Sequence, residues 1–127
     1  MKQDAIWVIA AAVANFALCA VWYSALGKHW LDGWRLLKRD VNPKDPKPYL
    51  VAFIGSLWAS YGVFLICKHI QPVEFGQQMA IAIGCWLFIE VGMGAKHYAF
   101  ARVNGKAFAV DYGVDLIGFI IMTFMVW

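Results

Sequence analysis

Residues 5–26 read AIWVIAAAVANFALCAVWYSAL, a run that contains no Asp, Glu, Lys or Arg. An α-helix needs roughly 20 mostly apolar residues to cross the hydrocarbon core of a bilayer. Three further stretches meet this requirement, at residues 49–67, 75–95 and 107–127. The first run lacks the basic start and the small-residue exit of a signal peptide, so we expect it to be retained as the first span.

The composition supports the same class. The chain is 62% apolar and 15% charged, whereas a soluble domain is about 45–50% apolar and about 25% charged. A small domain buries only about two-thirds of its surface in water, so lipid is the solvent that accepts this chain. We therefore predict an all-α integral membrane protein, a single domain over residues 1–127. Its four transmembrane helices should form an antiparallel bundle.

Basic residues are concentrated in two of the links. Of the eleven Lys and Arg, six lie between spans one and two and three between spans three and four. Because these two links fall on the same side of the bundle and basic loops remain in the cytoplasm, both termini should face outward. The net charge of +3 is thus a topology signal, and we expect no nucleic-acid partner.

The first link predicts a short amphipathic helix over residues 28–41 that lies along the membrane surface. Its aromatic and aliphatic side chains recur at helical spacing on one face, with cations on another, and prolines follow it. An anchor is the simpler interpretation, and a partner-docking surface is compatible with it. The residues expected to form this interfacial anchor are Trp22, Tyr23, Trp30, Trp34, Arg35 and Arg39.

Small residues predict where the helices approach one another, because association in lipid depends on close packing rather than on hydrophobic expulsion. Such residues recur on one face of each of the first two spans. The positions expected to pack are Ala10 and Ala14 in the first span and Gly55, Ala59 and Gly62 in the second. Glycines in the last two spans, among them Gly94, Gly113 and Gly118, indicate further close contacts.

Ionisable residues within the spans mark the candidate site, since such groups are costly in lipid and usually face the bundle interior. The candidate polar cluster consists of Asn15, Glu90, His97, Asp111 and Asp115. Three interpretations remain open. The acidic groups could form structural pairs, for example Glu90 with Lys96 or Arg102, or they could line a proton or cation path. A substrate or metal site is the third.

Catalytic and cofactor motifs are absent from the sequence. No His-x-x-His or Cys-x-x-Cys pair offers metal-ligand spacing, and Cys19, Cys67 and Cys85 are scattered over three spans. His29 and His97 could bind a haem, but lone histidines at a membrane boundary are more often interfacial polar groups. We therefore expect no enzyme, no metal and no cofactor.

One stretch also resembles a known family. The run Trp22-Tyr23-Ser24-Ala25-Leu26-Gly27-Lys28-His29-Trp30 is similar to the signature of a bacterial membrane family catalogued as domain of unknown function 1761. Residues 49–53, 104–108 and 111–113 resemble its second-span opening, its last loop and its fourth-span start. The resemblance to a bacterial membrane family implies four helices and no established activity. In a bacterial inner membrane, the outward termini that the basic links predict would lie on the periplasmic side.

Two functions from different classes follow. The first is a non-catalytic accessory or structural subunit that packs within a membrane complex, which the scarcity of extramembrane residues favours. The second is an oligomeric small transporter or channel that uses the carboxylates of the cytoplasmic half. The expected partners are the lipid bilayer and either other membrane subunits or further copies of the chain.

Overall fold

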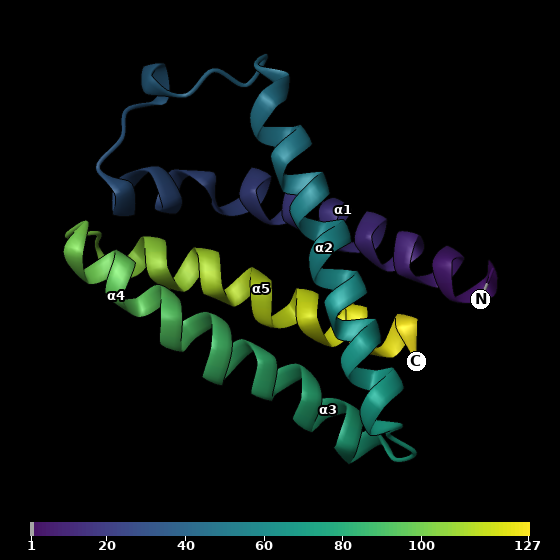
Figure 1. Ribbon diagram of the computed structural model, residues 1–127. Helices are drawn as coiled ribbons and strands as arrows, with labels where there is room; N and C mark the ends of the chain where they lie inside the picture. The colour runs from purple at the N-terminus through teal and green to yellow at the C-terminus, as the bar shows by residue number, and fades with distance from the viewer. Residues whose placement is uncertain (1) are drawn as a thin grey trace.

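The computed structural model describes residues 2–127, and helices account for most of them (Figure 1). The first span is α1 (Lys2–Trp34), the second α2 (Pro46–Ile70) and the last α5 (Gly105–Val126). The third span is a continuous helix made of α3 (Phe75–Gly84), the π-helical segment η2 (Cys85–Val91) and α4 (Gly92–Phe100). All four are long and apolar enough to cross a membrane, which confirms the predicted architecture of a multi-pass, all-α protein.

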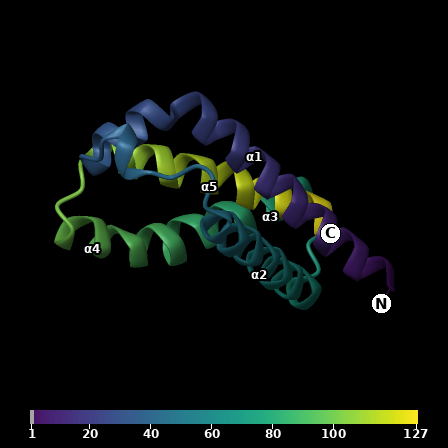
Figure 2. The ribbon, with the colours of Figure 1, turned by 90° about the horizontal axis from the view of Figure 1, so that it is seen from above.

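The central element of the bundle is α5. It lies between α1 and the third span, while α2 crosses them at a steep angle (Figure 1). Seen from above, α2 and α4 lie on the same side of α5, opposite α1 (Figure 2). The α1–α2 and α4–α5 links meet at one end of the bundle and both termini lie toward the other. The two basic links therefore share one end, as the sequence predicted.

Side-chain caps and left-handed residues set the ends of the helices. Asp45 accepts a hydrogen bond from the Lys47 backbone N–H at the start of α2, and Asn104 accepts one from the Lys106 N–H at the start of α5, both at 3.0 Å. The helices before each link end at residues with positive φ, a conformation that reverses the chain and stops helical hydrogen bonding. These residues are Arg35 (φ 57), Gln71 (φ 54) and Arg102 (φ 55).

The hydrophobic core lies at the end of the bundle that carries the termini. There α1, α2 and α5 pack through a buried cluster of Val8, Ala11, Val63, Phe64, Cys67, Met122 and Val126. The buried residues of α2 all fall between Ser56 and Cys67, and its first turns are exposed. The half of α2 nearest the basic links consequently leans away from the rest of the bundle.

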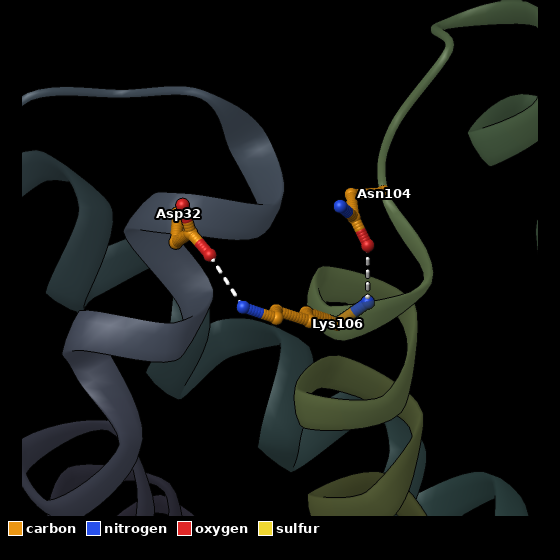
Figure 3. A network of polar contacts seen from close by, with 3 residues as sticks. All are labelled: Asp32, Asn104 and Lys106. Atoms are coloured by element: carbon orange, nitrogen blue, oxygen red, sulfur yellow. Dashed lines mark hydrogen bonds and ion pairs between the residues drawn. The ribbon is translucent and has the colours of Figure 1, made fainter.

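At the opposite end, α1 packs directly on α5. A Cβ added to Gly33 would lie 2.3 Å from the backbone nitrogen of Ala107, so only glycine allows this approach. The Gly33 carbonyl accepts a hydrogen bond from the Asn104 N–H at 3.1 Å. Beside it, the Lys106 ammonium lies 2.7 Å from the Asp32 carboxylate (Figure 3). These contacts hold the two basic links together.

The helix predicted for residues 28–41 is not a separate surface element. Residues 28–34 are the last two turns of α1, and the chain then leaves the helix at Arg35. Only a short 3₁₀ turn, η1 (Lys38–Asp40), follows before α2. The aromatic face that suggested a membrane-surface helix instead faces α5, where Trp30 and Trp34 donate hydrogen bonds to Asp111.

Candidate functional site

A cavity of about 1500 Å³ opens where α2 leans away from the other spans. All four spans line it, and residues of the α1–α2 link, including Lys38 and Asn42, line its end. We call this cavity the groove. Its lining residues include Asn15, Ser56, Cys85, Glu90, Asp115 and Phe119.

Two acidic residues from different helices meet in the groove. The carboxyl groups of Glu90 in η2 and Asp115 in α5 lie within hydrogen-bonding reach of each other. Glu90 lies ten residues before Phe100, where the third span ends, and Asp115 lies ten residues after Gly105, where α5 begins. Both acids therefore lie well inside helices that are long and apolar enough to cross a membrane. The groove thus contains an acidic pair within the spans.

The π-helical segment η2 directs Glu90 toward α5. A π-helical turn pairs residues five apart instead of four, and such turns occur mostly as single turns inside α-helices, frequently at functional sites. Within η2, the Trp86 indole donates its Nε1–H to the Tyr112 carbonyl oxygen of α5 at 2.8 Å. Trp86 and Glu90 therefore both face α5, and the widened turn is fixed to the central helix beside the acidic pair.

A second polar contact joins three spans next to this pair. The Asn15 amide of α1 donates to the Ser56 hydroxyl of α2 at 2.9 Å. Its amide oxygen lies against Gly118 of α5, where an added Cβ would lie 2.2 Å from it. Since Gly118 follows Asp115 by about one turn, this contact forms the adjoining part of the groove wall.

Asp111 is separate from the groove and is the acceptor at the centre of an aromatic cage. Its Oδ1 accepts hydrogen bonds from the Tyr23 hydroxyl and from Trp30 Nε1 at 2.9 Å. Its Oδ2 accepts from the Tyr98 hydroxyl and from Trp34 Nε1 at 3.3 Å. A carboxylate has acceptor sites for about four such donors, so this side chain is fully used. We call this arrangement the Asp111 clamp; it joins α1, α4 and α5.

The structure thus divides the predicted polar cluster into two parts. Asn15, Glu90, His97 and Asp115 line the groove, with His97 at an exposed position, whereas Asp111 belongs to the clamp. The neighbour of Glu90 is Asp115 rather than the basic residues that we considered as its partners.

The small residues of α2 do not mediate close helix packing as predicted. A Cβ added to Gly55 or Gly62 would meet no atom within 4 Å, and both glycines line the groove. On α1 the fully buried alanines are Ala11 and Ala12, while Ala10 and Ala14 are only partly buried. Of the predicted positions on α2, Ala59 does pack against the core. The expectation for Gly55 and Gly62 is wrong because α2 leans away there, and their small size instead widens the groove.

Close approach occurs on α5. An added Cβ at Gly94 would lie 1.4 Å from the Tyr112 hydroxyl oxygen, and one at Gly113 would lie 3.2 Å from the Trp22 ring. The sequence indicated these glycines but not Gly33, whose place after a predicted span boundary concealed it.

The expected interfacial anchor is also distributed differently. Trp22 donates its Nε1–H to the Val110 carbonyl at 2.9 Å, and the polar atoms of Tyr23, Trp30 and Trp34 reach Asp111. These four side chains therefore direct their donors into the bundle. Arg35 and Arg39 are exposed in the link. Sequence reasoning missed the clamp and its fourth donor, Tyr98. The available signal was that Tyr23, Trp30 and Trp34, at spacings of seven and four, share a face of α1.

No group of three or more His, Cys, Asp or Glu that could hold a metal ion occurs within residues 2–127. Four apolar spans with paired acids in a membrane groove define a small polytopic membrane protein. The chain belongs to the family described as "Protein of unknown function (DUF1761)", whose model matches residues 6–126. No curated protein and no solved structure matches it.

The clamp gives the sequence resemblance a physical meaning. The first motif contains Trp22, Tyr23 and Trp30, and the fourth-span motif contains Asp111. In the fold, Tyr23 and Trp30 donate hydrogen bonds to Asp111, and Trp22 donates to the residue before it. The two motifs thus meet at one contact between α1 and α5.

Proposed function

We propose that this protein is a small membrane transporter that acts as an oligomer and moves a solute past Glu90 and Asp115. The observation that carries the proposal is the acidic pair, which lies within two of the spans on the wall of a large groove. Ionisable residues inside a membrane span are costly and usually serve ion, substrate or proton paths. The role needs neither a nucleophile nor a cofactor, so we propose no enzymatic activity.

Self-association would close the side of the groove that a single chain leaves open. The groove is open beside α2, where Trp58 lines it and is 81% exposed. A second copy packed against this side would separate the acidic pair from lipid. The excess of basic residues in the links further supports a bacterial inner-membrane protein with those links in the cytoplasm and both termini in the periplasm.

The proposal is tested by solute-driven proton movement in proteoliposomes. Liposomes containing the purified protein and a lumenal pH dye receive sodium, potassium, tetraethylammonium or ethidium salts in turn. At least one of these cations should raise the lumenal pH faster than in protein-free liposomes, because a cation that enters displaces a proton outward.

Two variants make the result specific. Asp115→Asn should abolish the response, since it removes one member of the acidic pair. Asp32→Asn makes the same chemical change at an exposed site outside the groove and should retain it. A protein that responds to none of the four cations, or an Asp115→Asn variant that responds like the wild type, would overturn the transporter.

A second candidate is the accessory subunit, and the apolar surface of the third span favours it. Phe88 and Phe100 are 78% and 89% exposed and could pack against another membrane protein. Extraction in mild detergent, followed by sizing and mass spectrometry, separates the two proposals. A stoichiometric foreign partner would support the subunit, and a defined homo-oligomer would support the transporter.

A further inference from the structure

We infer that the groove binds an apolar organic cation of single positive charge, which exchanges with a proton at Glu90 and Asp115. The inference rests on the proposed function and names its substrate class. It can also be tested as binding, without any transport.

Charge complementarity argues for a cation. The two acidic side chains that line the groove are Glu90 and Asp115, and they are adjacent. The basic side chains among the lining residues are Lys38 of the exposed α1–α2 link and His97 at an exposed position of α4. An anion beside Glu90 and Asp115 would meet charges of its own sign, whereas a cation would meet charges of opposite sign.

The lining argues for an organic cation rather than a bare ion. Aromatic rings from three spans surround the space, among them Phe16 of α1, Tyr49 and Trp58 of α2, and Phe119 of α5. Ring faces attract cations and also bury apolar groups. The volume of about 1500 Å³ exceeds the roughly 300–1,000 Å³ of ordinary small-molecule pockets. A ligand with bulky apolar substituents fits this space.

The exchange balances in protons and charge. With one shared proton, the pair carries one negative charge and can accept either a second proton or the cation, and both products are neutral. Starting from the doubly protonated pair, binding of one cation releases one proton. Simultaneous binding of both would place a net positive charge in an apolar groove, so proton and cation compete.

The other titratable groups around the pair belong to every element that lines the groove. They are Cys19 and Tyr23 of α1, Lys38 of the link, Tyr49 of α2, Cys85 and His97 of the third span, and Tyr112 of α5. Asp111, one turn before Asp115, is held by the donors of the clamp. Glu90 and Asp115 are the carboxyl groups that face the space itself.

Binding of radiolabelled tetraphenylphosphonium to the purified protein in detergent micelles tests the inference. Equilibrium dialysis should show saturable binding. In the acidic range, the affinity for tetraphenylphosphonium should fall by about tenfold for each unit by which the pH is lowered, because one proton competes with one cation. Tetraphenylborate has nearly the same shape and the opposite charge, so it should not bind saturably when it is dialysed against the protein alone.

Variants of each acid locate the site. Glu90→Gln and Asp115→Asn should each weaken tetraphenylphosphonium binding by about tenfold or more, because an opposite charge in a partly buried site interacts strongly. Asp32→Asn should bind as the wild type does. Both groove variants are nearly isosteric, and size-exclusion profiles check their folding. The comparison of the two tetraphenyl ions in the wild type needs no variant.

Three results would overturn the inference. The first is the absence of saturable tetraphenylphosphonium binding, and the second is unchanged affinity in both groove variants. The third is equal binding of both tetraphenyl ions, which would indicate a site for acyl chains or detergent. The failures of the two proposals are distinguishable. Binding of tetraphenylphosphonium without any flux in liposomes would support the cation site and refute the transporter. Flux of sodium or potassium without tetraphenylphosphonium binding would support the transporter and refute the site for organic cations.

Discussion

Replacement of Asp111 by Asn should destabilise the bundle severely, although the two side chains have nearly the same shape. Each carboxylate oxygen accepts one tyrosine hydroxyl and one tryptophan N–H. Whichever oxygen becomes an amide NH₂, it can no longer accept these two hydrogen bonds. The tyrosine hydroxyl can rotate to accept from the amide, but a tryptophan N–H can only donate.

The magnitude follows from these lost bonds. Side-chain hydrogen bonds between transmembrane helices contribute about 0.6 kcal/mol on average and at most about 1.7. A buried donor left without an acceptor costs about 1–3 kcal/mol. Together they predict a loss of about 2–4 kcal/mol in the free energy of unfolding. This corresponds to roughly a 30- to 1,000-fold change in the unfolding equilibrium constant.

The chain contains its own reporter of unfolding. Cys67 is 0% exposed in the core, so its thiol becomes reactive when the helices separate. Unfolding is titrated with dodecyl sulfate in mixed micelles, in a background where the partly exposed Cys19 and Cys85 are Ala. The matched control Asp32→Asn changes an exposed site and should unfold at the same dodecyl sulfate concentration as the wild type. An Asp111→Asn variant that also unfolds like the wild type would refute the clamp.

Three further variants test the packing. Gly94→Ala should displace the Tyr112 ring, with a cost of about 1–3 kcal/mol in the same titration, whereas Gly55→Ala should be neutral because its Cβ meets no atom within 4 Å. Asn15→Ala and Ser56→Ala should show a coupling energy of about 0.6–1.7 kcal/mol in a double-mutant cycle, and strict additivity would exclude their hydrogen bond. Lys106→Ala should destabilise the protein only slightly, and this effect should disappear in high salt, because the ion pair with Asp32 is exposed; a large, salt-independent loss of stability would contradict this assignment.

The number and the approximate positions of the spans could be predicted from the sequence because they depend on composition over about twenty residues. The shared end of the two basic links could be predicted for the same reason. Neither prediction needs to know which helix faces contact. The placement of Glu90, Asp115 and Asn15 on a common interior space also followed from the high cost of polar groups in lipid.

The details that depend on helix rotation and crossing could not be predicted. Gly55 and Gly62 have the spacing of packing residues, but α2 leans away at that point and they line the groove. The π-helical turn around Glu90 changes the backbone hydrogen bonding without a characteristic sequence pattern. Trp30 and Trp34 resemble membrane-surface anchors until Asp111 is placed opposite them by the packing of α5 on α1.

Exchange of a proton for a cation at Glu90 and Asp115 can be measured by counting the protons released on binding. Tetraphenylphosphonium is added to the purified wild-type protein in weakly buffered, mildly acidic micelle solution, while a pH electrode records the change. We predict release of about one proton for each cation bound by the wild type. Asp115→Asn should bind the cation more weakly and should not release this proton. Cation binding without proton release at any acidic pH, or equal release from the variant, would exclude the exchange.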